Sequence, residues 1–132
     1  MTNLIEDGLY THLTAQSTIT DIVEDRIYPT VMPQQTALPA IVFYNVGTTP
    51  ISRQDGRPTL VRSRIQIDCY ADRVRDAKLL SEAVRDALES YVGMMGASSV
   101  QAVFLLEHGS DDFDDIPSSF RISSDYEVWH TL

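Results

Sequence analysis

Residues 60–91 read LVRSRIQIDCYADRVRDAKLLSEAVRDALESY, and they contain the clearest structural pattern in the chain. Its first part, from Leu60 to Tyr70, alternates between apolar and polar side chains. A period of two indicates a β-strand with one buried and one wet face, which is typical of an antiparallel sheet. The wet face carries Arg62, Arg64, Gln66, Asp68 and Tyr70.

The second part of the stretch predicts a helix. Apolar residues recur at spacings of three and four from Val74 to Tyr91, which places them in one stripe along a helix. Asp72 is the expected N-cap, and Gly93 and Gly96 are expected to end the helix. We therefore expect this helix to lie across the buried face of the strand.

Outside this stretch, hydrophobic patterns predict further helices and strands. Helical spacing covers residues 3–15 and, more briefly, 17–26, before Ile27-Tyr28-Pro29 leaves the helical register. The other expected strands are 39–46, 100–107 and 120–130. Strand 39–46 is nearly all apolar, so we expect it to be covered on both faces. In strand 100–107 the apolar face is expected to consist of Val100, Ala102, Phe104 and Leu106.

Three connections complete the expected architecture. Residues 47–59 predict a long hairpin arm between the first two strands, 93–98 a flexible link, and 108–119 an acidic turn. The element order is then α-β-β-α-β-β. We predict an α+β fold, a mainly antiparallel sheet with helices packed on one face, as a single domain over residues 1–132.

Composition excludes several classes of function. The chain has 19 acidic and 10 basic residues and a net charge of -9, which disfavours nucleic-acid binding. Its one cysteine, Cys69, allows no internal disulfide, and we expect it to be a buried hydrophobe. Neither a signal peptide nor a membrane-spanning run is expected, which fits a protein made in a reducing cytoplasm.

No sequence motif indicates catalysis, so we expect no enzyme activity and no cofactor. The acids of residues 107–115 lack the spacing of a calcium loop, and a solvated acidic turn is the expectation. His12, His108 and His130 are far apart and have no adjacent nucleophile motif, although a triad can assemble in space.

Charged residues suggest a contact surface between copies or with partners. Arginine is favoured at protein interfaces because its planar group pairs with carboxylates through two hydrogen bonds. The expected contact residues are Arg53, Gln54, Asp55, Gly56 and Arg57 of the arm, Arg62, Arg64, Gln66 and Asp68 of the wet face, and Trp129. A second surface, an interface or a channel wall, is expected at Asp111, Asp112, Asp114 and Asp115. One hypothesis is that the arginines of one copy meet the acidic turn, Asp111 to Asp115, of the next copy. The simpler alternative is a charged, solvated sheet face. For Trp129, half-burial under a helix is an equal alternative.

A run of motifs then resembles a known family. The motifs are Arg26-Ile27-Tyr28-Pro29, Pro39-Ala40-Ile41-Val42-Phe43-Tyr44, Arg64-Ile65-Gln66-Ile67-Asp68-Cys69-Tyr70-Ala71 and Ser124-Asp125-Tyr126-Glu127-Val128-Trp129. Together with the N-terminal helix, the arm and the central helix, they resemble the phage tail-completion proteins, also called tail-to-head joining or tail-terminator proteins. The resemblance covers nearly the whole chain, but the acidic residues 111–115 have no counterpart in its pattern.

This resemblance implies a non-enzymatic structural protein of the virion tail or neck, assembled in the cytoplasm of a bacterial host. It implies a hexameric ring that terminates the tail tube, meets the neck or connector of the head, and lets DNA pass without binding it. Two alternatives remain open from the residues alone. They are a small dimeric adaptor of the same fold, and a small hydrolase or metal-dependent enzyme.

Overall fold

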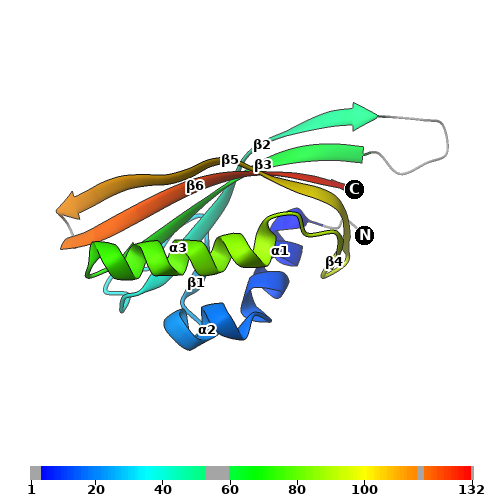
Figure 1. Ribbon diagram of the computed structural model, residues 1–132. Helices are drawn as coiled ribbons and strands as arrows, with labels where there is room; N and C mark the ends of the chain where they lie inside the picture. Colours follow the sequence, from blue (N-terminus) through cyan, green and yellow to red (C-terminus); the bar gives the residue numbers. More distant parts are fainter. Residues whose placement is uncertain (1–3, 53–59, 116–117, 132) are drawn as a thin grey trace.

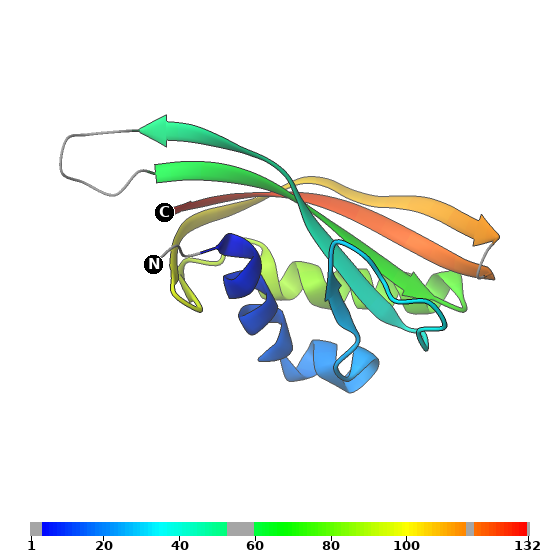
Figure 2. The same ribbon diagram turned by 180° about the vertical axis from the view of Figure 1, so that it is seen from behind.

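The computed structural model describes residues 4–52, 60–115 and 118–131, which form an α+β fold of two layers (Figure 1). The helices are α1 (Ile5–Thr14), α2 (Ser17–Val23) and α3 (Val74–Leu88). The strands are β1 (Ile27–Pro29), β2 (Ala40–Ser52), β3 (Leu60–Ala71), β4 (Gly93–Met95), β5 (Ser98–Asp115) and β6 (Ser118–Thr131). The described helices all lie on one face of the sheet, as the view from behind also shows (Figure 2).

The sheet is mainly antiparallel, as the sequence predicts. Its six described strands follow the order β1-β2-β3-β6-β5-β4, and only β1 and β2 run parallel. β3 lies in the middle and pairs with β6 along its whole length, from Leu60 opposite Thr131 to Ala71 opposite Phe120. Residues 60–91 therefore supply a central strand, β3, and directly after it the helix that covers the sheet, α3.

The core forms where α3 meets the sheet. Ile65 and Ile67 of β3 are each 1% exposed, and Leu80 of α3 is fully buried against the same cluster. Cys69 is buried beside them, and burial raises the pKa of its thiol. Leu9 of α1, near the N-terminus of the chain, belongs to the same core cluster. Alternation in β3 and the helical stripe of α3 thus produce the packing that they predict.

The predicted ends of α3 are wrong. Asp72 is not the N-cap, because the helix begins at Val74 and its N-cap residue, Arg73, makes no side-chain capping bond. The helix ends at Leu88, before the two glycines expected to stop it. Ser90 adopts a left-handed φ of 63°, and its N–H donates to the carbonyl of Val103 at 3.3 Å. This backbone contact with β5 redirects the chain at that point.

The segment predicted as a flexible link is instead a short hairpin. β4 pairs with the beginning of β5, from Gly93 opposite Val100 to Met95 opposite Ser98. Gly96 has a φ of 58° in the turn, a conformation that glycine adopts without a steric penalty. Two elements that the predicted order lacks, β1 and β4, therefore form the two edges of the sheet.

The arm is more regular than predicted, because β2 continues to Ser52. Residues 47–52 are strand rather than connection, and two register shifts, at Asn45/Gly47 and Pro50/Ser52, accommodate the glycine and the proline. β1 pairs only with residues 41–43, so the outer side of β2 beyond Phe43 is an edge in the described chain. Proline lacks the N–H of a ladder bond and is tolerated on such an edge.

The described part of the acidic turn predicted over residues 108–119 is also strand, and residues 116–117 lie outside the described residues. β5 runs to Asp115 and pairs with β6 up to Asp115 opposite Ser118. β4 covers only Ser98–Val100, so most of β5 is a second exposed edge among the described residues. Charged residues are common on edge strands because they oppose pairing with another chain.

The predicted apolar face of strand 100–107 is wrong as well. Register shifts at Val100/Ala102 and Leu105/Glu107 interrupt the alternation of β5. Val103 is buried in the core, whereas Phe104 is 50% exposed and Leu106 is 46% exposed. A bulge inserts one extra residue and changes which side chains face the core, and a simple period of two does not anticipate it.

Candidate functional site

The candidate site is the face of the sheet opposite the helices, which we call the open face. The predicted contact residues Arg62, Arg64, Gln66 and Asp68 alternate with buried residues of β3 and therefore lie on this face. Trp129 of β6 pairs with Arg62 in the register of the two strands and shares the same face. The structure thus brings the wet-face residues and the predicted tryptophan together.

Asp68 differs from its prediction, because it is buried although it lies on the open face. It is 2% exposed, and its Oδ1 accepts hydrogen bonds from Ser123 Oγ at 2.7 Å and Gln66 Nε2 at 3.0 Å. The Tyr44 hydroxyl lies 3.5 Å from its Oδ2. Burial and, next, the negative charge of Asp68 raise the pKa of Tyr44. This end of the open face is a closed polar network rather than a wet surface.

Arg64 occupies the middle of the open face and remains accessible. Its Nη2 lies 2.7 Å from Asp125 Oδ2, and its side chain is 53% exposed. The hydrogen bond from Arg64 to Asp125 raises the pKa of the guanidinium group. Beside this pair is a shallow pocket of about 180 Å³, lined by Gln66, Glu107, Ser123 and Asp125. Arg64 is therefore available to a partner without a change in fold.

An aromatic pair occupies the other part of the open face. Trp129 and Phe104 meet edge to face, with ring centroids 5.9 Å apart and planes inclined at 73°. The indole N–H of Trp129 donates to Glu127 Oε1 at 2.6 Å. Phe104 is half exposed, so the pair presents apolar surface next to charged residues. Buried aromatic anchors beside arginines are common in protein interfaces, and sequence reasoning missed Phe104 because of the bulge.

For the remaining predicted contact residues, either the position or the side chain lies outside the described structure. Arg53, Gln54, Asp55, Gly56 and Arg57 lie outside the described residues. Asp111, Asp112, Asp114 and Asp115 belong to the backbone ladder of β5 and β6, and their side chains are not described. The arm strands and the acidic end of β5 nevertheless point to opposite ends of the sheet (Figure 1). The described base of the arm and the acidic end of β5 therefore lie at opposite ends of one copy.

The structure brings together a serine and a histidine that have no sequence motif in common. Ser63 Oγ lies 2.7 Å from His130 Nε2 and 2.9 Å from Thr48 Oγ1. Ser63 is fully buried and His130 is 2% exposed, so neither side chain presents a reactive atom to solvent. His12 makes a separate contact, with Nε2 2.8 Å from the carbonyl oxygen of Ala87. His130 thus connects β6 to β3, and His12 connects α1 to α3.

Within residues 4–52, 60–115 and 118–131, no group of three His, Cys, Asp or Glu side chains is arranged to hold a metal ion. None of the helices in those ranges combines the length and the apolar character needed to cross a membrane.

Comparisons with known proteins agree with this architecture. Residues 7–131 match the family model described as "Tail completion protein gp17". Among solved structures, the fold is similar to that of a chain in "Virion of native gene transfer agent (GTA) particle", with a TM-score of 0.71 and 16% sequence identity. That similarity covers 94% of this chain and 92% of the other. No curated protein matches the sequence.

Proposed function

The chain belongs to the tail completion protein gp17 family, and from this premise we propose that it completes the tail as a hexameric ring around the DNA channel. It is a structural component of the virion tail. In the proposed ring, one side binds the last ring of tail tube protein and so terminates the tube. The other side meets the connector or neck of the head. Assembly would take place in the cytoplasm of the bacterial host.

The observation that carries the ring is the long pair of strands β2 and β3. They continue beyond the helical layer, away from the body that they help to form (Figure 2). Thirteen residues form β2 and twelve form β3, far beyond the usual strand length of about five or six. The distal part of β2 contributes little to the core of its own subunit, since Val46 is 55% and Ile51 is 37% exposed, and it is well placed to contact a neighbouring subunit.

The open face supplies a second surface for assembly. Arg62 and Arg64 are exposed there, and Phe104 adds a half-exposed aromatic ring. Large apolar side chains exposed beside charges support a protein contact. We place the ring contacts at the arm, residues 53–57, and at this face.

The charge of the chain supports passage of DNA without binding. A net charge of -9 repels the phosphate backbone, so a channel formed by such subunits would not retain DNA electrostatically. We further propose that the protein is not an enzyme. Ser63 and His130 form a hydrogen-bonded hydroxyl and imidazole, and the burial of both side chains supports this proposal.

Charge reversal in the arm tests the proposed function. We expect Arg53→Glu combined with Arg57→Glu to abolish the joining of purified tails to DNA-filled heads, with circular dichroism and melting temperature unchanged. The matched control is Arg73→Glu with Arg75→Glu, two exposed residues at the beginning of α3. Normal joining by the arm variant would remove the arm from the assembly contacts. A chain that forms only tight dimers and does not bind tail tubes would favour the adaptor alternative.

A further inference from the structure

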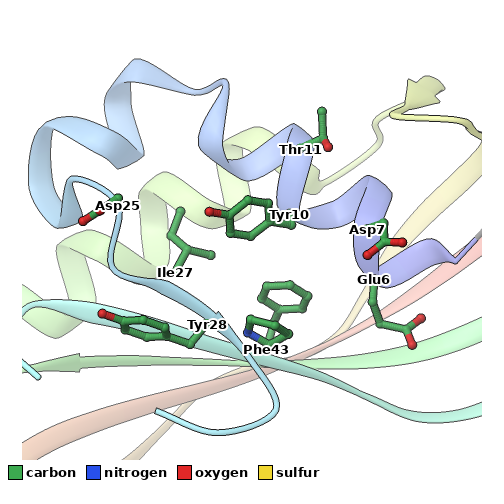
Figure 3. A pocket seen from close by; sticks show the side chains of 9 residues that line it. Glu6, Asp7, Tyr10, Thr11, Asp25, Ile27, Tyr28 and Phe43 are labelled. Carbon is green, nitrogen blue, oxygen red and sulfur yellow. The ribbon is translucent and has the colours of Figure 1, made fainter. Parts of the chain in front are cut away.

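A groove between α1 and β1 has no role in the assembly contacts described above. Its volume is about 560 Å³, and Ile27 and Phe43 form part of its apolar lining. Figure 3 shows Tyr10 projecting from α1 above Phe43, with Tyr28 of β1 below. Tyr10 is 40% exposed although it is a large aromatic residue. The groove is thus an apolar and aromatic depression open to solvent.

Carboxylates stand at both ends of this groove. Glu6 and Asp7 lie at one end and Asp25 at the other (Figure 3). Among the described residues, no arginine, lysine or histidine forms an ion pair with any of the three. Aromatic rings attract cations through their faces, and carboxylates pair with guanidinium groups. The groove therefore has the chemistry to hold arginine side chains.

The matching cations are concentrated in one short segment of the same sequence. Residues 53–64 contain Arg53, Arg57, Arg62 and Arg64, four of the ten basic residues of the chain. The other six basic residues are spread over the rest of the sequence, and two of them, Arg26 and Arg85, pair with Glu24 and Glu82. Arg53 directly follows the end of β2, and Arg57 comes four residues later. Charge complementarity thus selects the arm as the occupant of the groove.

The arm of a chain cannot reach the Asp25 end of its own groove, which lies beyond Phe43 from the base of the arm. β2 contributes Phe43 to the groove and reaches Ser52 at the base of the arm, nine residues further along an extended strand. At about 3.3 Å per residue these two positions are roughly 30 Å apart. Ser52 pairs with Leu60, so the seven residues between them can extend back by at most about 14 Å.

We propose that this groove receives Arg53 and Arg57 from the arm of a neighbouring copy of the chain. The inference deepens the proposed function and rests on its homo-oligomer, because it names the surface that accepts the arm. Donor and acceptor are different surfaces on each subunit, so the contact is head-to-tail and can close into a ring. Guanidinium groups would lie between the tyrosine rings and meet Asp7 and Asp25.

A photo-crosslinker at the groove tests the contact directly. In the full-length chain, Tyr10 is replaced with p-benzoylphenylalanine, and isotopically light and heavy proteins are mixed at millimolar concentration. We expect cross-links between chains that end within residues 53–59. The control carries the same crosslinker at Leu79, a 50% exposed residue of α3, and should not reach that segment. Cross-links to other segments, to an added tail or neck protein only, or no cross-links would overturn the proposal.

Charge exchange tests whether the contact depends on the named residues. We expect Asp7→Arg with Asp25→Arg to lower the yield of arm cross-links at least about tenfold. Adding Arg53→Glu and Arg57→Glu to the same chain should restore it, since the signs are exchanged on both surfaces. The matched control is Asp76→Arg with Asp86→Arg, two exposed acids of α3. A yield unchanged by the groove variant, or no restoration by the exchange, would contradict the inference.

These readouts separate the inference from the function on which it rests. If the arm variant fails to join tails to heads but the cross-links lie outside residues 53–59, the proposed tail function would be supported. The groove would then be excluded as the acceptor of the arm. If the charge exchange restores the cross-links but the arm variant joins tails to heads normally, the groove contact would be established. That result would also show that the contact is not needed for joining.

Discussion

Ser63 and His130 lie 2.7 Å apart, side chain to side chain, although they belong to different strands and are separated by 67 residues. Thr48 extends the contact to β2, so three strands share one polar chain near the base of the arm. Burial of these groups requires that each find a hydrogen-bond partner. The contact therefore stabilises the part of the sheet from which the arm extends.

The first prediction concerns pH. Burial lowers the pKa of His130, and this effect outweighs the opposing influences of its hydrogen bond with Thr131 and of the charge of Glu6. In the unfolded chain the His130 imidazole takes up a proton at about pH 6.5, whereas in the folded chain it does so only at lower pH. The stabilisation by neutral His130 is complete above that value and is lost as the pH falls below it. We expect the urea midpoint to fall between about pH 7.5 and 5.5, and to fall less in His130→Gln.

The second prediction concerns Gly8, where α1 approaches β4. A Cβ at this position would overlap the carbonyl oxygen of Met95. Alanine normally stabilises a helix relative to glycine by about 1 kcal/mol, but here the overlap should dominate. We expect Gly8→Ala to lower the free energy of unfolding by about 1–3 kcal/mol in urea titrations. Gly47→Ala, with open space around its Cβ, is the control, and a stabilised Gly8→Ala would contradict the packing.

The third prediction concerns the buried carboxylate of the open face. Asp68→Ala would leave the Ser123 hydroxyl and the Gln66 amide without their acceptor. An unsatisfied buried donor costs about 1–3 kcal/mol, and we expect a loss of stability in that range by chemical denaturation. Asp72→Ala serves as the control because Asp72 is exposed and does not cap α3. Equal stability of the two variants would show that the Asp68 network contributes nothing.

The fourth prediction separates assembly from stability on the open face. Arg64 forms an exposed ion pair, so charge reversal at Arg62 and Arg64 should leave the free energy of unfolding nearly unchanged. Joining of tails to heads should nevertheless be lost if this face contacts a neighbour. Arg73→Glu with Arg75→Glu is the control here too. Unimpaired joining by the Arg62→Glu, Arg64→Glu chain would remove the open face from the ring contacts.

The fifth prediction concerns mass in solution. Light scattering over a concentration series should give six times the chain mass of 14.8 kDa if the ring forms before assembly. A monomer would mean that the tail tube acts as the template for the ring. A tight dimer at all concentrations would contradict the hexamer and favour the adaptor alternative.

Much of the fold follows from local patterns. Alternation in β3 and the apolar stripe of α3 predict the central strand, the covering helix and the face of the sheet that each contacts. The same alternation is enough to place Arg62 and Arg64 on the face that the helices leave uncovered. These predictions succeed because periods of two and about 3.6 residues are properties of the backbone itself.

Register and pairing were not accessible to the same reasoning. The bulges of β5, which expose Phe104, depend on how β5 pairs with β6. The acidic residues of β5 look like a turn in sequence, but pairing with β6 keeps them in a strand. Trp129 could be placed on its face, whereas its contact with Phe104 required the neighbouring strand.

Local sequence patterns were sufficient to predict the α+β class, the wet and buried faces of β3, the helix that follows it and the acidic charge of the chain. The tertiary structure alone decided that Asp68 is buried, that Ser63 meets His130, and that α1 and β1 enclose a groove with carboxylates at its ends. The reason is physical: period and charge are carried by neighbouring residues, whereas burial, strand register and concave surfaces arise from segments that are distant in the chain and meet only on folding.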